Sequence, residues 1–326
     1  MIALASAAPS AWPIAFVLIA AILIAFAVAA YSNRTLRVRR KFVEPDDPDH
    51  RRIFHTMPFG KFIEVDGFKI RFVQCGSGPD VVLVHGFCES IVTWRLIFNH
   101  LAQRYRVTAF DLPGFGFSSK YPDKNYDLDT QADRVSKFLD ALTLDHPHLV
   151  GHSMGAAIIA RIAKSNPKRI GKVALLAPAV NRAVVRFHPL ATQWLGSMVK
   201  PFMVTPTLIR QIYLKLCVVK PPADLDEVLP EFYRPFQRSS AAMTTAAKHS
   251  WILYDKRLPA GLANLNCPIL VMAGEDDQVV KLPLIEEFLR LNPSAQCIVL
   301  AKTGHQIHEE QPREVVAKLC DFFDSK

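Results

Sequence analysis

The stretch HPHLVGHSMGAA, residues 146–157, carries the pattern Gly-x-Ser-x-Gly at positions 151–155. Apolar residues precede the pattern, and small and apolar residues follow it. This order predicts a strand, a tight turn at Ser153 and then a helix. The pentapeptide alone is weak evidence, because chance supplies it in roughly a tenth of chains of this length. The fold must therefore be argued from the sequence on either side.

Strand-like and helix-like segments alternate on both sides of this stretch. Short runs rich in Val, Ile and Leu predict strands at 69–75, 80–86, 105–114, 147–151, 172–178, 266–277 and 295–305. Apolar residues at helical spacing predict helices near 129–141, 154–165 and 283–291, and from about 312 onward. Such alternation predicts an α/β fold with a mostly parallel sheet and helices on both of its faces.

The alternation stops between residues 181 and 255, which are rich in Pro, aromatic residues and helical fragments. We expect this segment to be a helical cap, inserted after the sixth strand between core segments 61–180 and 256–326. Within the cap, Thr205-Pro206 is a good helix start. One apolar face is predicted for the helix that follows, made of Leu208, Ile209, Ile212, Tyr213 and Leu216.

Residues 12–31 form an apolar run without a charged side chain, bracketed by Trp12 and Tyr31. As a helix this run would be about 30 Å long, the thickness of the hydrocarbon core of a bilayer. Several bases follow at 34–41, which places the following chain on the cytoplasmic side. We therefore expect a single-pass membrane anchor over 1–33 and a juxtamembrane linker over 34–60. A cleaved signal peptide is the alternative.

The chain is basic, with 39 Lys and Arg against 30 Asp and Glu, a net charge of +9. No acid occurs between Asp145 and Asp224. The bases of this segment form either a solvated face or a basic cap that contacts an anionic membrane. No nucleic-acid-binding motif accompanies them, so no nucleic-acid partner is expected. The six cysteines have neither metal-site nor disulfide spacing, and we expect reduced thiols, no metal and no cofactor.

The turn at Ser153 has candidate partners farther along the chain. A serine hydroxyl is a weak nucleophile until a base removes its proton. His305, at the exit of the last predicted strand, is the favoured base, and His308 is its rival. The acid that orients the base is expected after the preceding strand, where Asp277 is favoured over Asp276. The chain order Ser, Asp, His agrees with a nucleophile on a strand-to-helix turn.

An acyl-transfer site also needs two donors for the developing oxyanion. We expect them to be the backbone N–H groups of Met154, directly after the nucleophile, and of Phe87, after the strand at 80–86. His85 is expected to be structural. Cys88 and Glu89 are expected to line the mouth of the site.

The segments VLVHGF, DLPGFGFS, GHSMGA, GEDD and TGHQIHEEQP occur in this order over about residues 65–325. In sequence and spacing they resemble the signature set of the α/β-hydrolase fold family. The resemblance implies an eight-stranded, mostly parallel sheet flanked by helices, with an inserted helical cap. Dehalogenases and epoxide hydrolases of this family carry Asp at the nucleophile position, whereas this chain has Ser153, as in the serine hydrolases of the family.

The resemblance implies a serine hydrolase that cleaves carboxylic esters through an acyl-enzyme. With the expected anchor, the chain looks most like membrane-tethered monoacylglycerol lipases, and the aromatic residues of the cap suit a lipophilic acyl substrate. Two alternatives remain open. One is a hydrolase of a small soluble ester, amide or C–C substrate. The other is a binding receptor of the same fold without catalytic activity.

Overall fold

An eight-stranded sheet is the centre of the computed structural model, which describes residues 57–58, 60–181, 204–239, 241–255 and 258–325. These residues lie in the second of two compact units, Val43–Lys326. The strand order is β1-β2-β4-β3-β5-β6-β7-β8. β2 pairs antiparallel with β1 and β4, and the other neighbours pair in parallel. The predicted α/β fold with a mostly parallel sheet is confirmed.

The strands are β1 (Lys61–Val65), β2 (Phe68–Cys75), β3 (Asp80–Val84), β4 (Arg106–Phe110), β5 (His148–His152), β6 (Val173–Leu176), β7 (Ile269–Gly274) and β8 (Gln296–Leu300). The short helices are η1 (Ile91–Trp94), α3 (Phe98–Leu101), η2 (Pro167–Arg169), η4 (Tyr213–Cys217), α10 (Leu258–Gly261) and α12 (Ile307–Glu310). The longer helices are α4 (Leu128–Ala141), α5 (Met154–Ser165), α7 (Pro206–Ile212), α8 (Leu225–Arg238), α9 (Ala242–Tyr254), α11 (Leu282–Leu291) and α13 (Pro312–Asp324).

Helices cover both faces of the sheet, and each face has its own hydrophobic core. Successive side chains of a strand point to opposite faces. In β3, Val82 and Val84 therefore join one core with residues of α4, α5 and α11. Val81 and Leu83 join the other core with residues of η1, α3 and α13. A strand buried on both faces needs a continuous apolar run, which is why β3, β6 and β7 are recognisable in the sequence.

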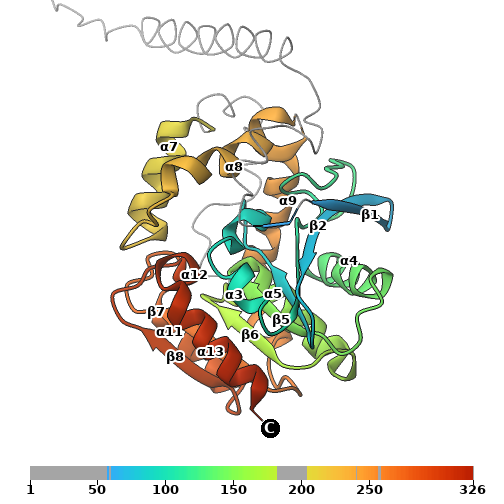
Figure 1. Cartoon of the computed structure of the whole chain (residues 1–326), viewed down its shortest axis with the longest axis vertical. Coiled ribbons are helices and arrows are strands. Elements are labelled where there is room, and N and C mark those ends of the chain that lie inside the picture. The colour runs from blue at the N-terminus through green and yellow to red at the C-terminus, as the bar shows by residue number, and fades with distance from the viewer. Residues whose placement is uncertain (1–56, 59, 182–203, 240, 256–257, 326) are drawn as a thin grey trace, which may run out of the picture. The chain divides into compact units, whose positions relative to one another are not determined.

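Between β6 and β7 the described chain is helical, and α7, α8 and α9 lie together at one end of the sheet (Figure 1). The single helix expected over 206–216 is in fact two pieces, because the α-helix α7 gives way to a π turn, η4. The wider π turn changes the angular spacing of the side chains. Tyr213 is consequently buried, whereas Ile212 and Leu216 are 38% and 48% exposed. The predicted common apolar face is wrong.

The membrane prediction is also corrected. None of the helices in the described part of the chain is long and apolar enough to cross a membrane. The longest of them, α4 and α8, have 14 residues each and carry charged side chains. At 1.5 Å per residue they reach about 21 Å, short of a bilayer core. The finding contradicts the single-pass membrane location, and the stretch 12–31 lies outside the described residues.

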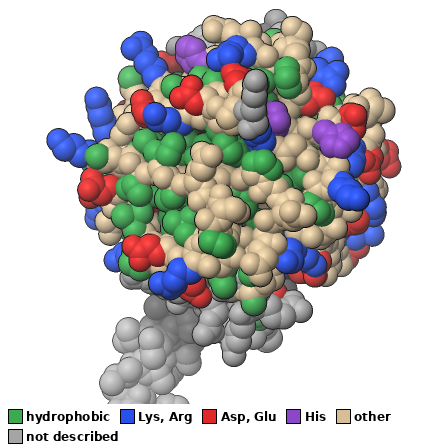
Figure 2. Space-filling view, turned by 90° about the horizontal axis from the view of Figure 1, so that it is seen from below, with side chains coloured by type: hydrophobic (Ala, Val, Ile, Leu, Met, Phe, Trp, Pro, Cys, Tyr) green, Lys and Arg blue, Asp and Glu red, His purple; other side chains and the backbone are tan. Residues whose placement is uncertain are grey.

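Some bases of the acid-free segment are paired with acids in the part of the chain that the structure describes. Three of them form ion pairs with acids from outside the segment: Arg161 with Asp129, Arg169 with Asp140 and Arg210 with Asp226. Figure 2 shows Lys and Arg side chains interspersed with Asp and Glu on the face seen from below. These pairs favour a solvated face for these three bases.

Candidate active site

Ser153 occupies the strained turn between β5 and α5. Its backbone has φ 51° and ψ −115°, a conformation that residues other than glycine rarely adopt. The turn is held by neighbouring strand β6, since the Ser153 N–H donates to the Leu176 carbonyl at 2.9 Å. Such a strand-to-helix turn presents the hydroxyl at the end of the sheet and begins a helix directly behind it.

The two glycines of the pentapeptide are required by close packing. A Cβ at Gly151 would lie 2.7 Å from the Ala156 nitrogen, inside the first turn of α5. A Cβ at Gly155 would overlap the Val84 carbonyl and lie 2.5 Å from the His85 carbonyl. Helix α5 therefore packs directly against the end of β3, which brings residues 85–89 beside Ser153.

The structure joins the predicted base and acid. The Nδ1 atom of His305 lies 2.8 Å from Oδ2 of Asp277, and both side chains are buried. The other carboxylate oxygen of Asp277 accepts the N–H groups of Val279 and Val280 at 2.7 and 2.8 Å. These bonds fix the carboxylate, so Asp277 can hold the imidazole in one tautomer. The rival acid, Asp276, is exposed.

The rival base, His308, has a structural environment. Its Nε2 lies 2.8 Å from the Thr93 hydroxyl, and its ring packs on Trp94 with 4.7 Å between the centroids. Burial, with the nearby His152 as a further cause, lowers the pKa of His308 well below its usual value. His308 is thus a neutral, packed side chain, whereas His305 is the histidine paired with the acid.

Residues 301–306 connect β8 to α12 and contain His305, and we call them the histidine loop. The backbone of this loop is bonded to η4. The N–H groups of His305 and Gln306 both donate to the Cys217 carbonyl, at 2.8 and 2.9 Å. Cys217 ends the π turn η4. A π turn frees a carbonyl from regular helical bonding, and such turns occur often at functional sites. Sequence reasoning gave no indication of this contact.

The expected oxyanion donors lie beside the nucleophile. A Cβ at Gly86 would be 3.0 Å from the Ser153 Cβ, so Phe87, the next residue, is close to the turn. Met154 is the first residue of α5, and a helix leaves its first N–H groups without an intrahelical acceptor. The positions of Phe87 and Met154 fit two amides that point toward one oxyanion, and this role stays a prediction.

His85 is structural, as its hydrogen bonds establish. Its Nε2 accepts the Leu112 N–H at 2.9 Å, so Nδ1 carries the proton and donates to the Gly86 carbonyl at 2.8 Å. Burial lowers the pKa of His85. The side chain is therefore a neutral brace under residues 85–90, the segment that we call the oxyanion loop.

Glu89 is not at the mouth of the site, and that prediction is wrong. Its side chain is only 8% exposed. The carboxylate accepts the Gly86 N–H and the Gln306 amide, each at 2.7 Å, and it lies 3.0 Å from Nδ1 of His152. Its neighbour Cys88 has a left-handed backbone with φ 61°, and burial raises the pKa of its thiol. Glu89 therefore supports the site from within, whereas Cys88 is half-buried and its place at the mouth stays a prediction.

Comparison with known proteins places this arrangement in a family. A model of the alpha/beta hydrolase fold matches residues 79–312, which include the Ser153 turn, Asp277 and His305. The chain belongs to the α/β-hydrolase fold family. Within the described residues, no cluster of His, Cys, Asp and Glu suits a metal ion.

Relatives of this α/β hydrolase include named hydrolases. It is 30% identical over 267 residues to the uncharacterized hydrolase YugF of Bacillus subtilis, covering 79% of this chain and 95% of that one. It is 28% identical over 270 residues to a 2-hydroxy-6-oxo-2,4-heptadienoate hydrolase of Pseudomonas putida, covering 81% and 95%. A crystal structure of a membrane phospholipase A, described as a bacterial virulence factor, superposes with TM-score 0.69 at 25% identity, covering 95% and 97%.

Proposed function

We propose that this α/β hydrolase is a serine hydrolase that cleaves carboxylic esters through an acyl-enzyme. The observation that carries the proposal is the pairing of His305 with a fixed Asp277 in a chain whose Ser153 occupies a strained strand-to-helix turn. A binding receptor without catalytic activity would not need these three features together. No metal or cofactor is required for this chemistry.

In the proposed reaction, Ser153 Oγ attacks the ester carbonyl while Nε2 of His305 takes the hydroxyl proton. The Asp277 carboxylate keeps the Nδ1 proton in place and stabilises the imidazolium. The amides of Phe87 and Met154 stabilise the oxyanion, and each such donor contributes about 3–4 kcal/mol of transition-state stabilisation. His305 then protonates the leaving alcohol. Water, activated in the same way, hydrolyses the acyl-enzyme.

A fluorophosphonate probe tests the nucleophile directly, since it labels an activated serine without requiring the natural substrate. Labelling of the full chain at Ser153, and its loss in Ser153→Ala, is the expected result. Equal labelling of both proteins, or none of the wild type, would refute a serine hydrolase. Asp276→Asn is a control, because this exposed carboxylate does not pair with the base in the structure.

For the substrate we propose a lipophilic acyl ester, such as a monoacylglycerol. The likeness to a membrane phospholipase A supports this class. So do three exposed apolar side chains on and beside η4, the element bonded to the histidine loop: Ile212, Leu216 and Val219. A series of p-nitrophenyl esters from acetate to palmitate tests the proposal. Rising kcat/KM with chain length supports it, and a preference for acetate contradicts it.

We further propose that basic side chains of the predicted cap contact anionic lipid aggregates that contain such an ester. Lys215 and Lys220 lie beside the exposed apolar side chains, whereas Arg210 is already paired with Asp226. Lys215→Glu should lower activity on anionic vesicles and leave hydrolysis of a monomeric ester unchanged. Equal activity on vesicles would contradict the contact.

A C–C hydrolase is the second candidate, and a specific likeness favours it. The Pseudomonas putida relative is named a 2-hydroxy-6-oxo-2,4-heptadienoate hydrolase and aligns over most of both chains. The same serine, histidine and oxyanion hole would support cleavage of either an ester C–O bond or a C–C bond. Assay of that dienoate beside the ester series distinguishes the two, because the true substrate class should give a kcat/KM larger by orders of magnitude.

A further inference from the structure

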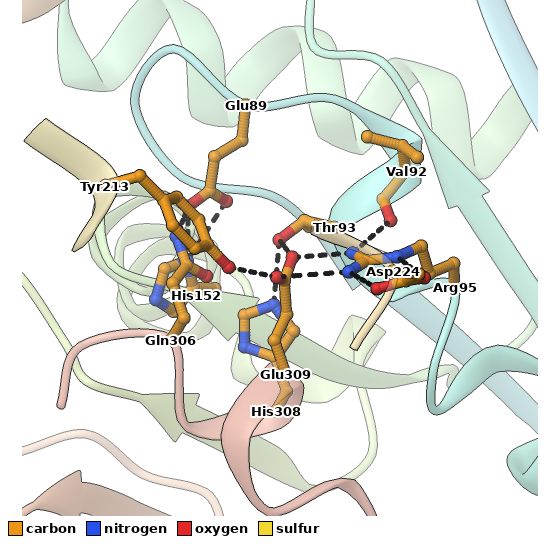
Figure 3. A network of polar contacts seen from close by, with 10 residues as sticks. All are labelled: Glu89, Val92, Thr93, Arg95, His152, Tyr213, Asp224, Gln306, His308 and Glu309. Atoms are coloured by element: carbon orange, nitrogen blue, oxygen red, sulfur yellow. Dashed lines mark hydrogen bonds and ion pairs between the residues drawn. The ribbon is translucent and has the colours of Figure 1, made fainter. Parts of the chain in front are cut away.

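Glu89 bonds to a direct chain neighbour of three predicted site residues, Phe87, Ser153 and His305. Its carboxylate accepts the Gly86 N–H. It also accepts the Gln306 side-chain amide, and Nδ1 of His152 lies 3.0 Å from both carboxylate oxygens (Figure 3). Gly86 precedes Phe87 of the oxyanion loop, His152 precedes Ser153, and Gln306 follows His305. One buried carboxylate thus joins three loops that are far apart in the sequence.

The hydrogen bonds of His152 reveal its charge. Nδ1 faces the Glu89 carboxylate, and Nε2 lies 3.1 Å from the His305 carbonyl. A carbonyl accepts but does not donate, and so does an ionised carboxylate, so both ring nitrogens must carry protons. His152 is therefore an imidazolium, in contrast to His85, which accepts a bond at Nε2 and is neutral.

The electrostatics of the pair agree with this assignment. Burial alone would lower the pKa of His152, but the Glu89 carboxylate and the His305 carbonyl outweigh it, and the pKa is raised. Burial alone would raise the pKa of Glu89, but His152 outweighs it, and the pKa is lowered. Both shifts favour the ion pair.

No other titratable group described around the pair takes the place of Glu89 as the anion or of His152 as the cation. His305 and His308 lie with ring centroids 4.7 Å from that of His152. His308 is neutral, because burial lowers its pKa and its buried Nδ1 has, among the described residues, no hydrogen-bond partner that could accept a proton. Its Nε2 donates to the Thr93 hydroxyl, which in turn donates to Glu309. Other groups that act on the pair are His85 and Asp277, whose bonds are described above, and two thiols. Burial raises the pKa of Cys88 and raises that of Cys217 to about 12.

We propose that Glu89 is a positioning residue, which holds the oxyanion loop, the Ser153 turn and the histidine loop in register through an ion pair with His152. The inference rests on the proposed serine-hydrolase function. The His152 imidazolium donates to the backbone of His305 itself, so the pair fixes the base relative to the nucleophile. A displacement of about 1 Å in such a site costs roughly 10²-fold in rate.

Glu89→Gln separates this role from simple packing, because the amide has the same shape but only one acceptor oxygen. It cannot accept from both Gly86 and Gln306, and it leaves His152 without a counter-ion, so the ring becomes neutral and loses one donor. We expect kcat to fall by about 10²-fold, with KM within about threefold of wild type. Fluorophosphonate labelling of Ser153 should slow in proportion.

The matched control is Glu309→Gln. Glu309 is an equally buried carboxylate that bonds Thr93, Arg95 and Tyr213 but no neighbour of a predicted catalytic group (Figure 3). It should lose stability yet keep kcat within about threefold. Equal loss of kcat in both variants, at matched folded fraction, would show that Glu89 acts only through stability and would overturn the proposal.

A spectroscopic readout on the wild type needs no stable variant. The full chain is labelled with ¹⁵N-histidine, and the NMR signals of His152 are assigned as those missing from His152→Asn. At pH 7 these signals should show that both ring nitrogens are protonated. One protonated nitrogen at pH 7 would overturn the ion pair. If Ser153 is never labelled but His152 is doubly protonated, the proposed function fails while the ion pair stands. If labelling is normal and unchanged in Glu89→Gln, the positioning role fails alone.

Discussion

At the residue scale, Asp277 illustrates how a side chain is specialised by its partners. One carboxylate oxygen is occupied by two backbone N–H groups, of Val279 and Val280, and the other faces Nδ1 of His305. The carboxylate is therefore prevented from rotating, and the tautomer of the base is fixed. The exposed Asp276 beside it does not contact the base, so we expect that Asp276 cannot replace Asp277.

Asp277→Asn should lower kcat by about 10³–10⁴-fold, with stability little changed. The amide oxygen would keep the two backbone bonds, so the NH₂ group would face His305 and force the proton onto Nε2. A protonated Nε2 cannot take the proton of Ser153. Steady-state kinetics on a p-nitrophenyl ester measure the loss, with Asp276→Asn as the control near wild-type activity. Similar kinetics for both variants would disprove the assignment of the acid.

At the element scale, the crossing of β3 and α5 requires Gly155. Gly155→Ala would place a methyl group against the Val84 and His85 carbonyls, so α5 or the oxyanion loop must shift. We expect a loss of more than about 2 kcal/mol in the free energy of unfolding, together with a large loss of kcat. Urea unfolding and ester kinetics measure both. Gly261→Ala is the control, because a Cβ there meets no described atom within 4 Å.

A substitution at the start of helix α4 should change the stability of the protein and leave its activity unchanged. Its N-cap, Asp127, accepts the Thr130 N–H at 2.8 Å. Asp127→Ala should lower the free energy of unfolding by about 1 kcal/mol. It should leave kcat unchanged, since the Asp127 carboxylate bonds Thr130 and Asn125 and no predicted catalytic residue. On the same helix, Asp133→Ala removes only an exposed pair with Lys137 and should cost less. Urea unfolding that ranks the two variants in reverse order would contradict the capping argument.

The elements differ in how far the sequence could predict them. β3, β6 and β7 are buried on both faces, and their apolar runs are easily recognised in the sequence. β1 was not among the predicted strands, because the charged Lys61 and Glu64 interrupt the short apolar run of this edge strand, KFIEV. The π turn η4 was also missed, because α-helical spacing continues through it in sequence while its geometry depends on the contact with the histidine loop.

The candidate site was predictable where its residues lie in local motifs, as Ser153, Asp277 and His305 do. The Glu89 network was not, because His152 and Gln306 are 63 and 217 residues away from Glu89 along the chain. A signal was nevertheless present. An acid that follows an apolar strand and precedes the apolar run IVTW must be buried, and a buried charge requires a partner.

At the scale of the whole molecule, buried histidines set the response to acid. His85, His249 and His308 are neutral and buried, and the pKa of each is lowered, in every case first through burial. An unfolded chain binds protons at these residues below about pH 6.5, whereas the folded chain does not, so stability falls as the pH falls. His152 affects stability in the opposite direction, because its pKa is raised in the folded protein. Its protonation stabilises the fold below about pH 6.5, and this contribution is lost as the pH rises through the folded-state pKa of His152.

His249 provides the sharpest test of this balance. Its Nδ1 donates to the Thr245 carbonyl at 2.7 Å, Nε2 accepts from Gln131, and burial lowers the pKa to about 3. Between pH 6.5 and 5, it should remove up to about 2 kcal/mol of stability, at about 1.4 kcal/mol per pH unit. His249→Asn keeps the Nδ1-type donor but cannot titrate. Its unfolding free energy should therefore fall less steeply over this range, before most carboxylates titrate. Exposed His146→Asn should follow the wild-type slope, and parallel curves for all three proteins would contradict the assignment.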